Sequence, residues 1–345
     1  MRDIPSADFR YDRRKLFDDV VGQRALTERL TALLASRDGQ FFIFAGSAGQ
    51  GKKMLARRFA KGLLAENGTD PDLAARWFEA GTHPDYRELL PEPSGKVIPV
   101  EQVRRQVVGD VGMLPQAGRL KVYLIEADGL NESGQNALLK TLEEPEAYCV
   151  FLLTVSQRER LLTTVLSRGT MLKFTGNSDA EVLEILKRRC TAEASVLTAA
   201  ARHSGGCPGV GIRLAESEWF ASCGAELSEL MDLLRSGSRS AVLLHGMQWF
   251  EAHREQTDLL LDMLEMRCRD LMLCIGGETA AERLVSPEEA ASLREAAAAF
   301  HGDFTPVARA AAVVNDVRGA RRYNGNFEIG MTHLLVRLQK ELYNA

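Results

Sequence analysis

The sequence predicts an α/β domain built on a parallel sheet and followed by helical domains, and three observations support this prediction. Short apolar runs alternate with amphipathic stretches over the first ~175 residues, as expected for strands that alternate with helices. A glycine-rich loop follows one of these runs and precedes a helical pattern. From about residue 240 to the end the pattern is helical, without a convincing strand.

Four apolar runs are predicted as strands buried on both faces, because they are short and almost wholly apolar. They are residues 40–45, 121–125, 149–154 and 171–174. After the glycine-rich loop, Leu55, Phe59 and Leu63 recur at helical spacing. A second helical pattern at residues 136–144 is followed by Pro145, which ends a helix.

The chain of 345 residues is too long for one ordinary core, so we expect several domains. Ser178 and Glu181 have capping-box spacing and open a helical run after the last predicted strand. Alanine-rich stretches near the end favour helix. The predicted domains are an α/β domain at 1–175, a small helical domain at 176–238 and a C-terminal helical domain at 239–345.

The composition excludes several classes of function. A formal net charge of -4 gives no electrostatic case for DNA binding by the whole chain, so any role at DNA is expected to be indirect or shared with partner subunits. No apolar run reaches the ~18–20 residues that span a bilayer, and the charged N-terminus lacks an apolar signal core, so we expect a cytoplasmic protein. The six cysteines lie far apart without a CxxC pair, so we expect reduced thiols and no zinc site.

A candidate phosphate loop spans residues 46–53, which fit the pattern G-x-x-x-x-G-K between a strand and a helix. Glycines let backbone N–H groups wrap a phosphate closely, and the pattern's lysine would reach the terminal phosphates. The candidate nucleotide-binding residues of the loop are Gly46, Ser47, Ala48, Gly49, Gln50, Gly51, Lys52 and Lys53. The last of them breaks the pattern, because a hydroxyl that holds magnesium is expected there.

The charge of Lys53 leaves the ligand of this loop open. Its ammonium would repel a metal ion, or it could stand in for part of the metal's charge and hold ATP or ADP without it. Alternatively, the loop binds nothing, or only a sulfate or phosphate. The acidic strand end is also abnormal, because Glu126 could bind metal but Ala127 cannot orient a water. Asp128 comes one position too late and is expected to be a solvated acid. Two defects in one site argue against ATP hydrolysis.

Together, these segments resemble the bacterial DNA polymerase III clamp-loader AAA+ family over nearly the whole chain. The most distinctive run is NALLKTLEEP at residues 136–145, followed by Ser167-Arg168-Gly169. Other similar segments are Phe17–Gln23, Gly81–Asp85, Ile98–Arg104, Gly118–Val122 and Asn324–Leu338. The resemblance implies an AAA+ phosphate-loop domain with Val20 and Val21 in its adenine pocket, then a small helical lid domain and a helical collar that joins subunits.

The resemblance also implies that Arg168 is an arginine finger that acts in trans on the ATP of a neighbouring subunit. A guanidinium beside the γ-phosphate stabilises charge in the transition state, which is worth roughly 10³–10⁵ in rate. The delta-prime branch of the family fits better than the ATPase (tau/gamma) branch, which is expected to keep the hydroxyl, an Asp-Glu pair and a sensor arginine. Here Val210 stands at the sensor position, with Arg213 as an alternative. The four zinc-binding cysteines that the family often has are missing.

The function that the resemblance implies is assistance in ATP-dependent loading of the sliding clamp onto primed DNA, without ATP hydrolysis by this chain. The expected partners are the tau/gamma and delta subunits, with the clamp and DNA reached through the complex. An active ATPase motor subunit of the tau/gamma type is the alternative, favoured by Lys52 and opposed by Lys53 and Ala127. A stand-alone nucleotide-binding module would leave the C-terminal helices unused. His83 and Asp85 are expected to be structural, since no nucleophile lies at a recognisable spacing.

Overall fold

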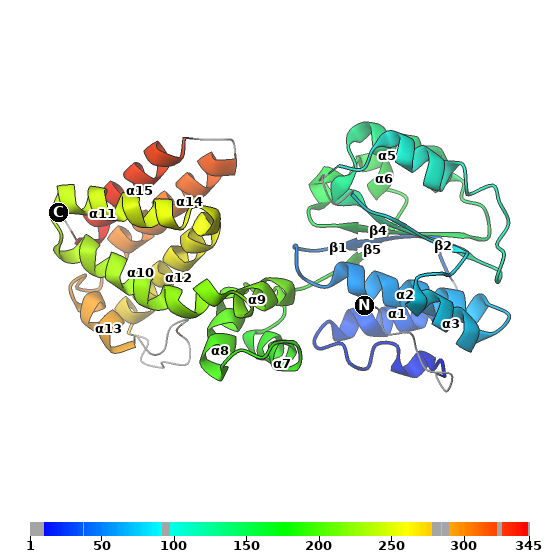
Figure 1. The fold of residues 1–345 in the computed structure, drawn as a ribbon, viewed down its shortest axis with the longest axis horizontal. Helices are drawn as coiled ribbons and strands as arrows, with labels where there is room; N and C mark the ends of the chain where they lie inside the picture. The colour runs from blue at the N-terminus through cyan, green and yellow to red at the C-terminus, as the bar shows by residue number, and fades with distance from the viewer. Residues whose placement is uncertain are drawn as a thin grey trace. The chain divides into compact units, whose positions relative to one another are not determined.

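The structure, a computed structural model, describes residues 10–343 except 37, 92–96, 278–283, 285–289 and 323–325. The first two residues of the predicted collar segment 324–338 thus lie outside the described residues. The chain divides into two compact units (Figure 1), which are Met1–Ile185 with Gly206–Val210 and Leu186–Gly205 with Gly211–Ala345. The finer division of the helical part into lid and collar stays a prediction.

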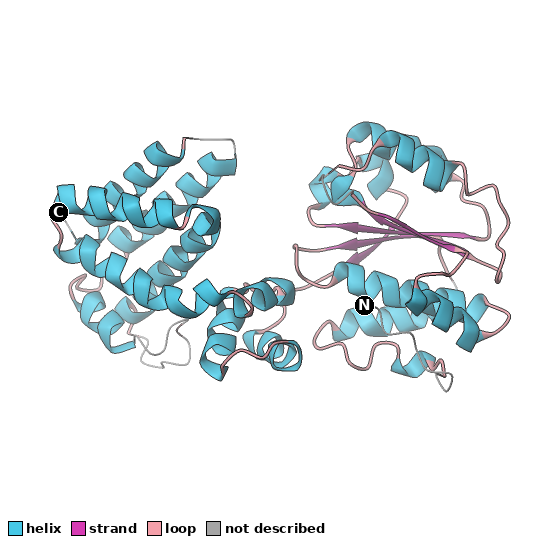
Figure 2. Cartoon of the chain, in the orientation of Figure 1, coloured by secondary structure: helices cyan, strands magenta, loops and turns pink. Residues whose placement is uncertain are grey.

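A five-stranded parallel sheet forms the centre of the first unit, in the order β2-β3-β4-β1-β5. Its strands are β1 (Phe41–Ala45), β2 (Tyr86–Leu89), β3 (Lys121–Glu126), β4 (Cys149–Val155) and β5 (Thr170–Lys173). Every strand found among the described residues lies in this unit. The described residues that follow β5 are mainly helical (Figure 2). The predicted α/β fold class with a helical C-terminal part is therefore confirmed.

Helices alternate with the strands and then follow them. Up to residue 173 they are α1 (Arg24–Ser36), α2 (Lys52–Asn67), α3 (Pro71–Ala80), α4 (Val100–Val103), α5 (Glu132–Glu143) and α6 (Thr163–Leu166). A π-helical turn η2 (Arg104–Val108) continues α4, and short 3-10 turns are η1 (Arg13–Lys15), η3 (Ala127–Gly129), η4 (Arg158–Arg160) and η5 (Arg254–Gln256). The later helices are α7 (Asp179–Arg189), α8 (Ala194–His203), α9 (Pro208–Ala215), α10 (Glu218–Ser236), α11 (Arg239–Ala252), α12 (Thr257–Ile275), α13 (Ala290–Ala298), α14 (Thr305–Arg322) and α15 (Phe327–Tyr343).

Apolar side chains alternate between the two faces of the sheet and produce two hydrophobic cores. Phe42 and Phe44 of β1 pack in one core with Phe59 of α2, whereas Ile43 packs in the other core with Leu138 of α5. In Figure 1, α1, α2 and α3 cover one face of the sheet and α5 and α6 cover the other. Because both faces are buried, the strands are almost continuously apolar in sequence.

The predicted strands are all present, and the two predicted helices correspond to α2 and α5. The capping box before α7 is formed, since Ser178 N–H donates to Glu181 Oε2 at 2.8 Å and Glu181 N–H donates to Ser178 Oγ at 3.3 Å. The sequence does not predict β2. This edge strand is short, carries Arg87 and Glu88, and buries only its last residue fully.

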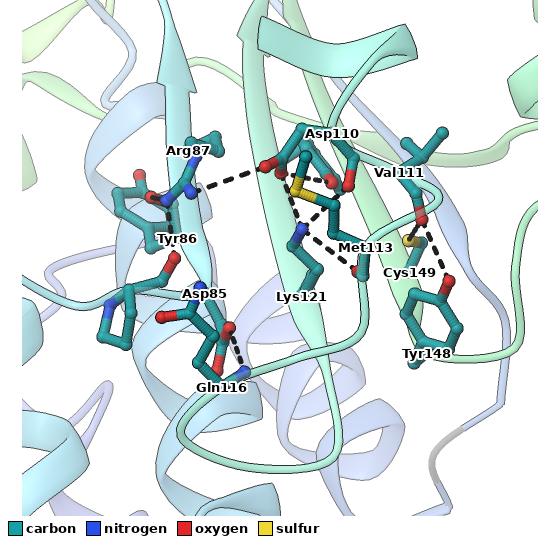
Figure 3. A network of polar contacts seen from close by, with 12 residues as sticks. Asp85, Tyr86, Arg87, Asp110, Val111, Met113, Gln116, Lys121, Tyr148 and Cys149 are labelled. Atoms are coloured by element: carbon teal, nitrogen blue, oxygen red, sulfur yellow. Dashed lines mark hydrogen bonds and ion pairs between the residues drawn. The ribbon is translucent and has the colours of Figure 1, made fainter.

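A buried polar network fixes the loop between η2 and β3 at the edge of the sheet (Figure 3). The Lys121 side chain is 4% exposed, and its Nζ lies 2.8 Å from the carbonyl oxygen of Asp110 and 2.8 Å from its Oδ2. The Tyr123 hydroxyl donates to the same carboxylate at 2.8 Å. Burial raises the pKa of Asp110, but the hydrogen bonds from Lys121 and Tyr123 outweigh it and hold that pKa below its usual range.

Asp85 anchors the later part of the same loop. Its buried carboxylate accepts the N–H groups of Gln116 and Ala117, each at 2.7 Å. Its own N–H donates to Nδ1 of His83 at 3.1 Å, and burial lowers the pKa of that histidine. The carboxylate is therefore used by the backbone of the loop, which supports a structural role for both residues.

We expect Asp85→Asn to lower the free energy of unfolding by about 2 kcal/mol, because the amide nitrogen would face a backbone N–H that then lacks an acceptor. Urea denaturation followed by tryptophan fluorescence measures this change. Asp38→Asn is the matched control, since Asp38 is exposed and its replacement should change stability by less than about 0.5 kcal/mol. Equal stabilities for the two variants would contradict the anchoring role of Asp85.

Candidate functional site

The candidate phosphate loop connects β1 to α2, and its shape depends on glycine. Gly49 and Gly51 have φ angles of 84° and 82°, in the left-handed region that other residues rarely adopt. A Cβ on Gly46 would lie 2.6 Å from the Cβ of Phe174. The first N–H groups of a helix have no partner within it and can bind phosphate. The predicted strand–loop–helix arrangement is therefore present, and nucleotide binding by it stays a prediction.

Lys52 folds back onto the loop. Its Nζ donates to the carbonyl oxygens of Gly46 at 2.5 Å and Ser47 at 2.8 Å, and lies 3.3 Å from Ser156 Oγ. Burial lowers the pKa of this ammonium, and the carboxylate of Asp128 opposes that shift. A phosphate bound by Lys52 would have to replace its contacts with the loop carbonyls.

Lys53 reaches from the first turn of α2 to the ends of β2 and β3. Its Nζ lies 3.6 Å from Glu88 Oε1 and 3.8 Å from Glu126 Oε2. Arg57 pairs with the other oxygen of Glu88 at 3.3 Å. Where the loop pattern expects a hydroxyl for magnesium, this chain thus carries a cation between two carboxylates. These residues do not fit a divalent metal ion, because the oxygen ligands that it needs are already paired with an ammonium.

The acidic strand end contains no group that could orient a water at the position after Glu126. Ala127 is buried there and has no polar side chain. The expectation that Asp128 is a solvated acid is wrong, since both its oxygens accept the N–H of Ser156, at 3.0 and 2.9 Å. The chain leaves β3 in the η3 turn, and Asp128 is therefore turned toward the end of β4.

Backbone around Gly209 covers the tip of the phosphate loop within the first unit. The Gly209 N–H donates to the carbonyl oxygen of Gly49 at 2.8 Å. A Cβ on Gly209 would lie 2.9 Å from Gly49 Cα, and one on Gly49 would lie 3.1 Å from the Val210 nitrogen. Val210, the predicted sensor position, thus lies beside the loop, whereas Arg213 is exposed and belongs to the second unit.

Val20 and Val21 belong to an N-terminal segment that is fastened to the chain before α7. The carbonyl oxygen of Val21 accepts Asn177 Nδ2 at 3.1 Å, and Val20 packs against the core that contains α2. Gly22 has a φ angle of 71°, and a Cβ on it would lie 2.2 Å from Asn177 Nδ2. The predicted role of the two valines in an adenine pocket stays a prediction.

Arg168 lies at the edge of the sheet formed by the amino ends of the strands, whereas the phosphate loop lies at the edge formed by their carboxyl ends. It precedes β5, whose first residue, Thr170, pairs with Phe42 near the beginning of β1. The loop starts after Ala45, at the other end of β1. The four residue steps along this strand cover ~13 Å, which is more than an arginine side chain spans. A guanidinium held at this edge does not serve the phosphate loop of its own chain.

The Arg168 guanidinium is held by two neighbours. Its Nη2 lies 2.6 Å from Glu143 Oε1, at the end of α5. Its Nη1 donates to the carbonyl oxygen of Thr164 and lies 3.4 Å from Ser167 Oγ. The Ser167 hydroxyl also donates to the Thr164 carbonyl at 3.2 Å.

The part of the chain that the structure describes contains neither a metal site nor a membrane-spanning helix. There, no group of three His, Cys, Asp or Glu side chains is arranged to hold a metal ion. None of the six cysteines, all within the described residues, is part of a disulfide bond. Among the same residues, every helix is too short or too polar to cross a membrane.

A parallel sheet in this order, with a glycine loop between β1 and α2, defines a phosphate-loop fold of the AAA+ kind. Residues 22–178 match the family model described as "DNA polymerase III, delta subunit". The resemblance of this segment to the DNA polymerase III clamp-loader family is therefore confirmed.

Curated relatives of two kinds are similar to the chain. A DNA polymerase III subunit delta' of Pseudomonas aeruginosa is 40% identical over 174 residues, which are 48% of this chain and 53% of the relative. The subunit delta' of Escherichia coli is 37% identical over 145 residues, 41% of this chain and 43% of the relative. A subunit tau/gamma of Haemophilus influenzae is 34% identical over 188 residues, 52% of this chain and 27% of the relative. The chain thus spans about half or less of the length of the relatives that it matches.

Two solved structures from Thermotoga maritima are also similar. A DNA polymerase III, gamma subunit-related protein has a TM-score of 0.43 and 15% identity, over 90% of this chain and 99% of that protein. The Holliday junction branch migration motor RuvB has a TM-score of 0.40 and 19% identity, over 61% of this chain and 65% of that protein.

We expect Lys53→Ser to make thermal stability depend on Mg²⁺, because the substitution frees Glu126 and the Oε1 atom of Glu88, although Arg57 still pairs with Oε2, and it restores a hydroxyl. In EDTA the variant should be less stable than the original chain by less than about 1 kcal/mol, since the ion pair is partly exposed. Millimolar Mg²⁺ should raise the melting temperature of the variant only.

Differential scanning fluorimetry measures these shifts, and Lys53→Ser combined with Glu126→Gln is the control that should lose the response to Mg²⁺. The same response to Mg²⁺ in the original chain and in Lys53→Ser would show that Lys53 does not exclude the metal.

Proposed function

We propose that this chain is a delta-prime-type subunit of a DNA polymerase III clamp loader. In this function it assists ATP-dependent loading of the sliding clamp onto primed DNA in the cytoplasm. Its partners are the tau/gamma and delta subunits, and the clamp and DNA are reached through the complex. It supplies Arg168 to ATP bound by a neighbouring subunit and does not hydrolyse ATP itself.

The placement of Arg168 is the observation that carries this proposal. The Arg168 side chain is 33% exposed and lies at the edge of the sheet that is remote from the phosphate loop of its own chain. An arginine serves phosphoryl transfer only when it contacts the transferred phosphate. If Arg168 acts in this way, the phosphate belongs to another subunit.

The residues beside the phosphate loop support the proposal that this chain does not hydrolyse ATP. Lys53 pairs with Glu88 and Glu126, and Ala127 offers no group to orient a water. Phosphoryl transfer depends almost wholly on positioning and on stabilisation of charge, and both are weakened here. Whether the loop still holds ATP or ADP is a separate question, and its intact glycine geometry is compatible with either.

An active motor subunit of the tau/gamma type is the second candidate function. It is favoured by the similarity to tau/gamma relatives, which covers about as much of this chain as the similarity to the delta' relatives. The intact Lys52 also favours it, whereas Lys53 and Ala127 oppose it.

We expect Arg168→Ala to reduce turnover at the ATP site that faces this chain about a thousandfold, because the transition-state charge loses its guanidinium. The measurement is DNA-stimulated ATPase activity and clamp loading by a complex reconstituted with the loader subunits of the same source. Arg158→Ala is the matched control, since this arginine is also exposed and its ion-pair partner is the adjacent Glu159. Unchanged activity with Arg168→Ala would remove the trans-finger role.

The isolated full chain is expected to hydrolyse no ATP above background, with or without Mg²⁺. Lys52→Ala should leave that background unchanged, because no catalytic metal is held. A phosphate-release assay on the chain and this variant measures both. Steady turnover that Lys52→Ala abolishes would favour the motor subunit over the proposed function.

A further inference from the structure

We propose that Glu143 is a positioning residue that braces Arg168 before the neighbour's ATP arrives. This inference rests on the proposed function, because it assigns a partner to the finger. Glu143 touches neither substrate nor phosphate in this role. It fixes the direction of the guanidinium from behind, through the ion pair between Oε1 and Nη2 at 2.6 Å.

The carboxylate is itself held in place by the helix that carries it. Glu143 is the last residue of α5, and the neighbouring Leu142 is 3% exposed, in the core on that face of the sheet. Leu138, one turn earlier, is 1% exposed. A carboxylate at a helix C-terminus meets the negative end of the helix dipole. The positive charge of Arg168 offsets this repulsion, so the carboxylate of Glu143 and the guanidinium of Arg168 each stabilise the other in the paired position.

The contact with Glu143 leaves N–H donors of Arg168 available to a phosphate. A guanidinium has five N–H donors in a fixed fork, and the contacts with Glu143, Thr164 and Ser167 involve only Nη1 and Nη2. Nε and part of the Nη2 group keep donors without a partner among the described residues. The finger can therefore present these donors to a phosphate while its other side stays paired.

The ion pair between Arg168 and Glu143 is weak enough to order the arginine without holding it permanently. The side chains of Arg168 and Glu143 are 33% and 43% exposed, so water and salt screen their attraction. An arginine that docks on a phosphate from a disordered state loses rotamer freedom at that moment. A contact that orders the side chain beforehand removes part of this loss, which would otherwise raise the barrier to phosphoryl transfer.

The neighbouring Glu144 provides a natural comparison. It is also exposed, but its side chain makes no hydrogen bond or ion pair with the described residues. The two glutamates therefore have the same charge and nearly the same position in the sequence. Only one of them contacts the finger, so an effect of charge alone would be the same for both.

The test uses the reconstituted complex, with steady-state ATPase activity measured as a function of ATP concentration. Glu143→Ala should reduce kcat at the site facing this chain about tenfold and leave the KM for ATP unchanged. Glu143→Gln keeps the chain length and one acceptor oxygen, so it should restore most of the activity. Glu144→Ala should behave as the original chain, and Arg168→Ala should lose far more than Glu143→Ala.

A second readout does not depend on activity. In the isolated full chain, ¹⁵N NMR of the arginine side chains should show restricted rotation of the Arg168 guanidinium, and Glu143→Ala should abolish the restriction. Adding Glu143→Ala to Arg168→Ala should cause no further loss of turnover, since the brace acts only through the finger.

The outcomes separate this inference from the proposed function. If Arg168→Ala abolishes turnover at the site but Glu143→Ala has no effect or raises kcat, the brace is wrong and the finger remains. If Arg168→Ala has no effect, the finger and the brace are both wrong. Equal losses with Glu143→Ala and Glu144→Ala, or a lost assembly with Glu143→Gln, would also overturn the brace.

Discussion

The parallel arrangement of the five strands is the constraint on which both halves of the candidate site depend. All strands run in one direction, so their carboxyl ends share one edge of the sheet and their amino ends share the other. The phosphate loop, Glu126 and Asp128 therefore meet at one edge. The connection through α6 returns the chain to the amino end of β5, and this return places Arg168 at the other edge.

The two edges differ in how their charges are balanced. At the carboxyl edge, Lys53 gives the acidic strand ends a counter-ion that is part of the chain, so neither dialysis nor a chelator can remove it. At the amino edge, the pair between Glu143 and Arg168 leaves N–H donors of the guanidinium available. The first arrangement closes a site to metal, whereas the second keeps a cation ready for use. The proposed function, a subunit that contributes to catalysis without performing it, rests on this difference.

Much of the fold could be predicted from the sequence, because buried strands and amphipathic helices have distinct apolar patterns. Strand β2 could not, since an edge strand with two charged residues has no such pattern, and the partner of Lys53 on that strand was missed with it. Asp128 was misjudged because the chain turns directly after β3. The pairing of Glu143 with Arg168 depends on topology, which brings the end of α5 beside the end of α6. The position of Arg168 was predicted only because the segment resembles a known family.

The contact between Gly49 and Gly209 bears on how such a chain evolves. A side chain at either position would press against the facing backbone, so glycine is favoured both at the loop tip and in the first turn of α9. Recovery of hydrolysis would also require a new residue at position 53 and another at position 127. A change at position 53 alone would open the site to metal but would still leave no group at position 127 to orient a water. Under the proposed function, the loss of hydrolysis would therefore be easy to acquire and hard to reverse.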